Sequence, residues 1–368
     1  MTAASWSHAG EAGATGSITA SLSGAMDTSA ASLISAQAGA LNLSASSLTH
    51  AGRAAGGTDL RLVLAGGLEA ARGSLLLARN GTLDVSAGSW VNYGQAGAGG
   101  SLAARLTGDL YTDAASLLVA QGGGLTLTAR NWTHAGEAAA FGNFSATLSG
   151  TLATLSGGTV TAHAGDLLLS AGALSHRGAV SAGRNATLSA GGSFETQAGS
   201  SVAVRSGLLT LNAGTWLHTG ELKLSAGLDA TVAGAFTTTA GSLMASQDGT
   251  LGVKAAVIHH DGRISSGGNI SLQSERELRT TQTSMLTTSA GDISLAAGEP
   301  LSIWADWAPG AMPCCVLWVM PITGHSGRAA GHAFCPGRRP DQCQYDSDRR
   351  KPDHRRPCRR PGGGRRRQ

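Results

Sequence analysis

The first 299 residues of this 368-residue chain contain neither cysteine nor proline. All five cysteines lie at Cys314 or later, and all nine prolines lie at Pro300 or later. Without cysteine, residues 1–299 can form no disulfide and no thiolate metal site. The absence of proline suits interior β-strands, in which each backbone N–H donates to a neighbouring strand.

Aromatic residues and long apolar runs are also scarce. Aromatic residues make up only 4% of the chain, so a core must be built mainly from leucine, valine, isoleucine and alanine. No uninterrupted apolar segment is long enough to cross a bilayer, which predicts that the chain has no membrane span. The first residues lack the basic start and apolar run of a secretory signal, so no signal peptide is visible.

Charge is divided unequally along the chain. Residues 1–299 hold 14 Lys and Arg and 18 Asp and Glu, a net charge of −4, whereas residues 300–368 hold 13 and 5, a net charge of +8. The overall charge of +4 describes neither part. We therefore infer no nucleic-acid partner from it.

A six-residue pattern recurs every 42 residues without insertion or deletion, and it decides the architecture. One example is residues 131–136, which read NWTHAG. The polar fourth position of this pattern is occupied, in order, by His8, His50, Asn92, His134, His176, His218 and His260.

A column of glycines keeps the same 42-residue spacing. Its members are Gly39, Gly81, Gly123, Gly165, Gly207, Gly249 and Gly291. Apolar residues follow two and four positions after each glycine, as Leu125 and Leu127 follow Gly123, and this period of two predicts a strand with one buried face. A similar strand lies earlier in each unit, because residues 269–272 resemble residues 292–295. Each 42-residue unit therefore divides into two similar coils, one slightly longer than the other.

Coils that span about half a unit are too short to hold a strand, a crossover helix and a second strand. They predict an all-β fold, a right-handed parallel β-helix in which each coil pairs with the coils above and below it. Two coils in each of seven units give about 14 rungs, and a strand spacing of about 4.8 Å makes a rod roughly 65–70 Å long. We expect the glycines at sharp corners, where a positive φ favours glycine.

The sequence predicts two regions. Residues 1–299 form the β-helix, and the repeat is already under way at Trp6, so we expect the chain to be a piece of a longer protein. Residues 300–368 contain proline, arginine and cysteine but no repeat, and their basic, weakly apolar composition predicts disorder. The abrupt change of composition suggests the hypothesis that this tail is the product of a frameshift in a GC-rich gene.

These motifs resemble the haemagglutinin-repeat region of the filamentous haemagglutinin family. The resemblance is carried by Gly-x-Leu-x-Leu-x-Ala followed by Trp-x-His-x-Gly, as in GGLTLTARNWTHAG at residues 123–136, and it covers residues 1–299. Members of the family are bacterial exoproteins exported by two-partner secretion, and they include adhesins and the stalks of contact-dependent growth-inhibition toxins.

The resemblance implies a structural and adhesive rod segment that attaches a bacterium to host or neighbouring cells. It implies an outer-membrane two-partner-secretion transporter as a partner of the intact protein, and a host-cell or bacterial surface receptor or glycan as its target. The intact protein is expected to be secreted to the bacterial cell surface. The alternative that the resemblance allows is the stalk of a contact-dependent growth-inhibition toxin.

The repeat offers little chemistry beyond structure. Successive histidines of the column lie two rungs apart, about 9–10 Å, whereas two imidazoles that share one zinc lie about 4 Å apart. A turn histidine that hydrogen-bonds the backbone is the preferred interpretation, with Asn92 supplying the same capability. The pair His259 and His260 is too small for a metal site. We therefore predict no metal, no cofactor and no catalytic residue.

A β-helical polysaccharide-degrading enzyme is the less favoured alternative. Such an enzyme needs carboxylates that converge on one groove. The acidic residues of the repeat are single and form no Asp-x-Asp pair, which favours a role in solvation. They include Asp27, Asp59, Asp84, Asp109, Asp166, Asp229 and Asp248.

The tail contains cysteines, histidines and a basic run, which could suggest a zinc cluster or a nucleic-acid site. It has no Cys-x-x-Cys pair, and the run from Arg338 to Arg367 holds no aromatic residue besides Tyr345. Disorder or a frame error remains the preferred interpretation of both features.

Overall fold

The chain folds into a parallel β-solenoid. The structure, a computed structural model, describes residues 1–298 and 301–302, all of which lie in the compact unit Met1–Ser326. These residues contain β-strands but no helix, so none of them belongs to a helix of the length and apolarity that crossing a bilayer requires. The predicted all-β parallel β-helix is confirmed. The predicted disorder and the frameshift hypothesis for residues 300–368 concern a segment that lies outside the described residues, apart from residues 301–302.

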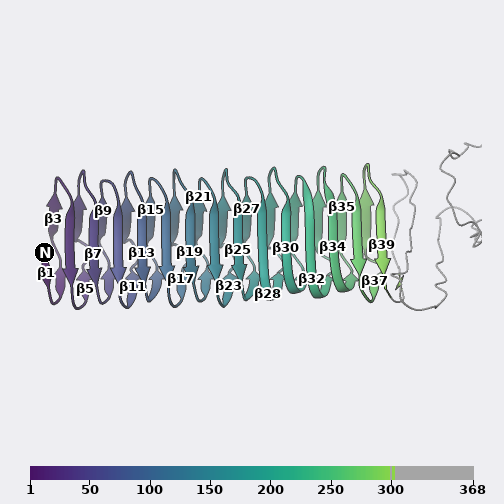
Figure 1. The fold of residues 1–368 in the computed structure, drawn as a ribbon, viewed down its shortest axis with the longest axis horizontal. Helices are drawn as coiled ribbons and strands as arrows, with labels where there is room; N and C mark the ends of the chain where they lie inside the picture. Colours follow the sequence, from purple (N-terminus) through teal and green to yellow (C-terminus); the bar gives the residue numbers. More distant parts are fainter. Residues whose placement is uncertain (299–300, 303–368) are drawn as a thin grey trace, which may run out of the picture. The chain divides into compact units, whose positions relative to one another are not determined.

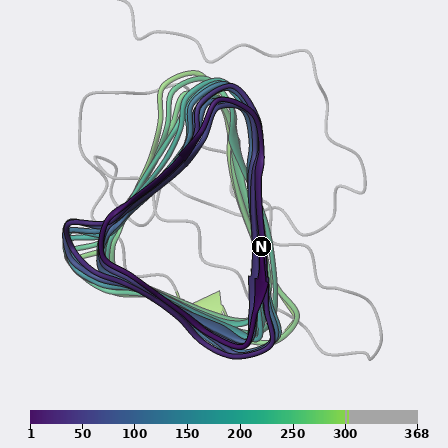
Figure 2. The same cartoon turned by 90° about the vertical axis from the view of Figure 1, so that its left-hand side faces the viewer.

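Each coil contributes strands to three faces, which give the solenoid a triangular outline when it is seen along its axis (Figure 2). The strands lie across the axis and stack side by side in chain order (Figure 1). All pairings between coils are parallel. The strands of the first and second faces form one sheet of 26 strands, and those of the third face form a separate sheet of 14 strands. Fourteen strands separated by 13 steps correspond to about 13 turns of the chain.

The strands are assigned to the faces as follows. The first face comprises β1 (Thr2–Ala3), β4 (Ile18–Leu22), β7 (Leu41–Ala45), β10 (Leu60–Leu64), β13 (Leu83–Ala87), β16 (Leu102–Leu106), β19 (Leu125–Ala129), β22 (Phe144–Leu148), β25 (Leu167–Ala171), β36 (Ile270–Ser274) and β39 (Ile293–Ala297). The second face comprises β2 (Trp6–His8), β5 (Met26–Thr28), β8 (Leu48–His50), β11 (Gly67–Ala70), β14 (Ser89–Asn92), β17 (Leu110–Thr112), β20 (Trp132–His134), β23 (Thr151–Thr154), β26 (Ala173–His176), β37 (Leu278–Thr280) and β40 (Leu301–Ser302). Four long strands run through both faces: β28 (Ala186–Thr196), β30 (Leu209–His218), β32 (Gly227–Thr238) and β34 (Thr250–His260). The third face comprises β3 (Glu11–Ala14), β6 (Leu33–Ala36), β9 (Arg53–Gly56), β12 (Leu75–Ala78), β15 (Gln95–Ala98), β18 (Leu117–Ala120), β21 (Glu137–Ala140), β24 (Thr159–Ala162), β27 (Ala179–Ala182), β29 (Ser201–Val204), β31 (Glu221–Leu224), β33 (Leu243–Ser246), β35 (Arg263–Ser266) and β38 (Met285–Thr288).

The core consists of apolar side chains that stack on their counterparts in the next coil. Along the first face, inward positions alternate with outward ones, as in β7, where Leu41, Leu43 and Ala45 are buried. Burial of one leucine contributes about 1.5–3 kcal/mol, and stacking repeats this contribution in every coil. One continuous column runs through Leu41, Leu60, Leu83, Leu102, Leu125, Phe144, Leu167, Ala186, Leu209, Leu228, Leu251, Ile270 and Ile293.

The strand register confirms that the 42-residue unit consists of two coils. On the first face Leu41 pairs with Leu60, and Leu60 pairs with Leu83, so a shorter step along the chain is followed by a longer one. On the second face Leu48 pairs with Leu68, and Leu68 pairs with Trp90, and these two steps are closer to each other in length. The coils therefore differ mainly in their turns, and one corner of the outline in Figure 2 shows turns of two sizes.

The predicted glycine column lies at the corner between the third and first faces, but its glycines are not needed for a positive φ. The described glycines with positive φ are Gly73, Gly157, Gly199 and Gly227, and none belongs to the column. The requirement is instead close approach, because a Cβ on a column glycine would overlap the preceding coil. The overlapped atoms include Ser17 Oγ below Gly39, Asp59 Oδ1 below Gly81, Ser101 Oγ below Gly123, the Gly142 carbonyl carbon below Gly165 and Asn185 Oδ1 below Gly207.

A polar residue beneath six of the seven column glycines binds the coil above it. In six units its side-chain oxygen accepts a hydrogen bond from the backbone N–H of the residue that follows the column glycine. The distances are 3.1 Å for Ser17 with Ala40, 2.7 Å for Asp59 with Thr82, 3.3 Å for Ser101 with Gly124, 2.9 Å for Asn143 with Asp166, 3.1 Å for Asn185 with Leu208 and 2.8 Å for Asn269 with Asp292.

Two glycine-to-alanine variants test whether the column glycines are required because neighbouring coils approach closely. We expect Gly165→Ala to lower the free energy of unfolding by about 1–3 kcal/mol, because the new methyl group meets backbone atoms of Gly142 that cannot move aside. The control is Gly97→Ala in β15, where a Cβ would meet only Leu77 Cδ1 at 3.6 Å. Thermal unfolding followed by circular dichroism measures both variants, and equal midpoints for the two would contradict the role assigned to the column.

Candidate functional site: the buried histidine column

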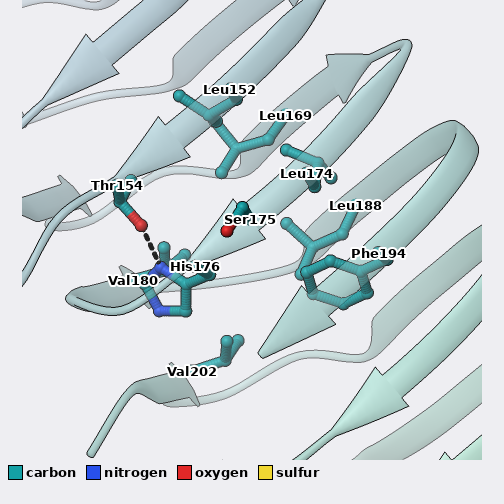
Figure 3. Close-up of a pocket in the computed structure, with 10 residues that line it drawn as sticks. All are labelled: Leu152, Thr154, Leu169, Leu174, Ser175, His176, Val180, Leu188, Phe194 and Val202. Carbon is teal, nitrogen blue, oxygen red and sulfur yellow. Dashed lines mark hydrogen bonds between the residues drawn. The ribbon is translucent and has the colours of Figure 1, made fainter. Parts of the chain in front are cut away.

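The histidine column lies at the end of the second-face strands, where the chain turns toward the third face. His50, His134, His176, His218 and His260 are buried, and Asn92 is fully buried in the equivalent place. His8, in the first coil, is half-buried. In Figure 3 the imidazole of His176 points toward Thr154 of the preceding coil.

One imidazole nitrogen of each buried histidine is bonded to a threonine hydroxyl of the preceding coil. The Nδ1–Oγ1 distances are 2.9 Å for His50 with Thr28, 2.7 Å for His134 with Thr112, 2.5 Å for His176 with Thr154, 2.5 Å for His218 with Thr196 and 2.8 Å for His260 with Thr238. This threonine column was not recognised from the sequence, although it has the same 42-residue spacing.

The second imidazole nitrogen faces a backbone carbonyl of the following coil. The Nε2–O distances are 3.3 Å from His8 to Leu33, 3.1 Å from His50 to Leu75, 2.9 Å from His134 to Thr159, 3.1 Å from His176 to Ser201 and 3.1 Å from His218 to Leu243. His50, His134, His176 and His218 have both partners, so each of these four histidines joins three successive coils.

This pair of partners assigns the tautomer. A carbonyl oxygen can only accept a hydrogen bond, so Nε2 carries the proton and donates it. Nδ1 is then unprotonated and accepts from the threonine hydroxyl. The histidines are neutral in this arrangement, and both ring nitrogens of His50, His134, His176 and His218 are satisfied inside the solenoid, whereas His260 Nε2 is buried without a hydrogen-bond partner.

Burial also lowers the pKa of these histidines. Desolvation lowers the pKa of His134 and His218 to about 4, with the backbone hydrogen bonds to Thr159 and Leu243 opposing the shift. The same cause lowers the pKa of His260 to about 4 and lowers the pKa of His50 and His176. These five buried histidines are therefore uncharged at neutral pH.

The arrangement leaves the column little capacity for catalysis or metal binding. Both imidazole nitrogens of His50, His134, His176 and His218 are engaged with the neighbouring coils. Within residues 1–298 and 301–302, no three His, Cys, Asp or Glu side chains gather as a metal ion would require. The interior void in Figure 3 measures about 10 Å³, which is about the size needed for one water.

The glycine two residues after the column position is required by the coil below it, except in the first coil, where a Cβ on Gly10 would meet no atom within 4 Å. A Cβ on Gly52, Gly94 or Gly220 would overlap the hydroxyl oxygen of a buried serine, namely Ser32, Ser74 or Ser200. These serines end the longer turns of alternate coils. The His-x-Gly turn therefore packs directly over a longer turn that ends in serine.

The adjacent histidines of β34 lie in different environments. His260 is buried and belongs to the column, whereas His259 is exposed and its Nε2 lies 3.7 Å from Glu277 Oε2. Successive strand residues point to opposite sides of a sheet, so the two rings cannot converge on one ion.

Several of the acidic residues considered from the sequence pair with arginines of neighbouring coils. Asp109 accepts two hydrogen bonds of 2.9 Å from Arg130, and this arginine lowers the pKa of Asp109 to about 2. Asp84 Oδ1 lies 2.6 Å from Arg105 Nη1, and Asp166 Oδ2 lies 3.0 Å from Arg184 Nη2. These three carboxylates therefore contribute to ion pairs along the surface.

Position 92 shows how the histidine and threonine columns depend on each other. In the one unit where asparagine replaces histidine, the threonine below it is replaced by Ala70, which pairs with Asn92 in the strand register. Trp90 Nε1 and Asn92 Nδ2 are then buried without a hydrogen-bond partner. The equivalent Trp132 Nε1 donates to Thr112 Oγ1 at 3.0 Å, whereas Trp216 Nε1 is unpaired although Thr196 lies in the coil below it.

Comparison of the chain with protein-family models, with curated proteins and with solved structures finds no match. The resemblance to the filamentous haemagglutinin family therefore stays a prediction from the sequence.

A double-mutant cycle tests the coupling of the two columns. We expect Asn92→His alone to be destabilising by about 1–3 kcal/mol, because Nδ1 would be buried opposite Ala70 without a donor. Adding Ala70→Thr restores that donor, so the double variant should be more stable than the two single effects predict. Unfolding free energies of the four proteins measure the coupling, and additive effects would contradict it.

The neutral histidines predict a dependence of stability on pH. Between pH 6.5 and about 4 the unfolded chain binds protons at positions 134, 218 and 260, and the folded chain does not. The free energy of unfolding should therefore fall as the pH falls through this window, by up to about 3 kcal/mol for each of these histidines, and level off below it. Thermal midpoints at pH 7 and pH 5 test this, and His134→Asn should show the smaller difference. Equal midpoints for the wild type at both pH values would be incompatible with buried neutral histidines.

Proposed function

We propose that this chain is a structural and adhesive rod segment of a secreted bacterial surface exoprotein. The observation that carries the proposal is the unbroken stack of parallel strands, which on the third face continues through 14 strands. The length of a rod of this kind grows in proportion to the number of coils, because each coil adds about 4.8 Å along the axis. It would hold binding regions away from the cell that displays it.

The surface supports a role in contact rather than in catalysis. A shallow groove of about 560 Å³ runs across several coils and is lined by small side chains, among them Ser170, Ser189, Asn212 and Thr231. Its lining contains no carboxylate. Glycoside hydrolysis by the common mechanism needs two carboxyl groups beside the bond that breaks. We accordingly propose that the chain is not an enzyme.

The remaining parts of the proposal rest on the family resemblance. Export of the intact protein would require an outer-membrane two-partner-secretion transporter, and attachment would require a receptor or glycan on a host or bacterial surface. The outward positions of the repeat, rich in serine and threonine, offer hydroxyl groups in regular columns to such a surface.

Two measurements test the proposed function with the full chain. Negative-stain electron microscopy should show rods whose straight part is at least roughly 60 Å long, from 13 steps of about 4.8 Å. Beads coated with the chain should attach to epithelial or bacterial cells several-fold more than albumin-coated beads. Compact particles would refute the structural role, and attachment equal to albumin would refute the adhesive role.

A further inference from the structure

Two residues that occur in only one of the seven 42-residue units, Arg72 and Tyr93, line the same recess on the surface. Tyr93 stands where the other units carry Ala9, Ala51, Ala135, Arg177, Thr219 and Asp261. Arg72 stands where they carry Ala30, Ala114, Ser156, Ala198, Ala240 and Gln282. Arg72 and Tyr93 each occur in one unit only, at positions whose occupant varies between units, so the scaffold does not fix them and they can serve a local role.

These residues line a recess at the corner between the second and third faces. The recess has a volume of about 350 Å³, and its lining includes Arg53, Arg72, Tyr93 and Gln95. Its floor is the short turn at Tyr93 and Gly94, between the longer turns that contain Gly73 and Ala115. The alternation of long and short turns therefore creates the hollow, and the local departures supply its chemistry.

Arg72 is held in place by a buried acid. Its Nη2 donates to Asp113 Oδ2, and the Asp113 side chain is only 6% exposed while that of Arg72 is 70% exposed. Asp113 Oδ1 also accepts the backbone N–H of Ala115 at 2.9 Å. One edge of the guanidinium is thus anchored, and its other N–H groups face solvent at the recess.

The other polar groups of the recess are available to a ligand. Arg53 is exposed, and within residues 1–298 and 301–302 no carboxylate forms an ion pair with it. The ring of Tyr93 packs edge-on against Tyr111, with centroids 5.8 Å apart, which fixes its orientation. Gln95 begins β15 next to it and is exposed.

We propose that this recess binds a carboxylate-bearing sugar, such as a sialic or uronic acid residue of a surface glycan. A guanidinium donates two parallel hydrogen bonds to a carboxylate, and two arginines border the recess. The tyrosine ring offers a flat apolar surface with a polar edge, and the amide of Gln95 can bond sugar hydroxyls. The volume suits a ligand of one or two sugar rings. This inference rests on the proposed adhesive function and gives it a ligand class.

The repeat itself supplies variants that other coils already tolerate. Arg53→Glu introduces the residue found at Glu11, Glu137 and Glu221, and Tyr93→Ala introduces the residue found at Ala9, Ala51 and Ala135. Both should therefore fold like the wild type. The matched control is Arg263→Glu, which makes the same charge change at the same repeat position five units away from Arg53.

Binding of the full chain to sialyllactose and trigalacturonate, with lactose as the neutral probe, tests the proposal by calorimetry or surface plasmon resonance. The wild type should bind at least one acidic sugar and bind lactose at least tenfold more weakly. Arg53→Glu and Tyr93→Ala should each weaken binding of that acidic sugar at least tenfold, and Arg263→Glu should leave it unchanged.

Three results would overturn the assignment of the recess. They are binding of lactose as tight as that of the acidic sugars, equal losses in Arg53→Glu and Arg263→Glu, and no binding of either acidic sugar at millimolar concentration. Bead attachment to cells separates this inference from the adhesive function: attachment that persists in Arg53→Glu and Tyr93→Ala would leave adhesion standing and reject the recess as its site.

Discussion

The structure depends on one constraint, the placement of each residue directly over its counterpart in the neighbouring coil. Parallel pairing satisfies the backbone N–H and C=O groups between coils, and the same register aligns side chains of one kind into columns. The leucine column from Leu41 to Leu60 and Leu83 exists only because the turns absorb the difference in length between the shorter and the longer coil. Every other feature of the solenoid is a consequence of that register.

Much of this could be predicted from the sequence because the repeat has no gaps. The 42-residue spacing and the apolar alternation after Gly123 were sufficient for the fold class and for the two-coil unit. The role of the glycines could not be predicted in the same way. Spacing identifies a position where a side chain is excluded, but only coordinates distinguish a positive φ from a coil that passes within contact distance, as at Gly165.

The partners of the histidines were missed for a related reason. Thr112 and His134 lie in different coils, and neither residue belongs to a local motif that contains the other. The signal was available as a second column with the period of the repeat. The joint replacement at Ala70 and Asn92 would have strengthened it, because both columns change in the same unit. The recess at Arg53 was likewise invisible, since a hollow between turns of unequal length is a property of packing.

A polar column inside an apolar core has a physical purpose that leucine cannot serve. A slip of two positions along a strand would place Leu43 where Leu41 belongs, and the apolar columns would tolerate it. The same slip would separate His134 from Thr112 and leave both buried without partners, at a cost of about 1–3 kcal/mol for each unsatisfied group. We therefore interpret the histidine and threonine columns as the feature that specifies the register. The leucines supply most of the stability, and the polar pairs select one stack among several that would be nearly as apolar.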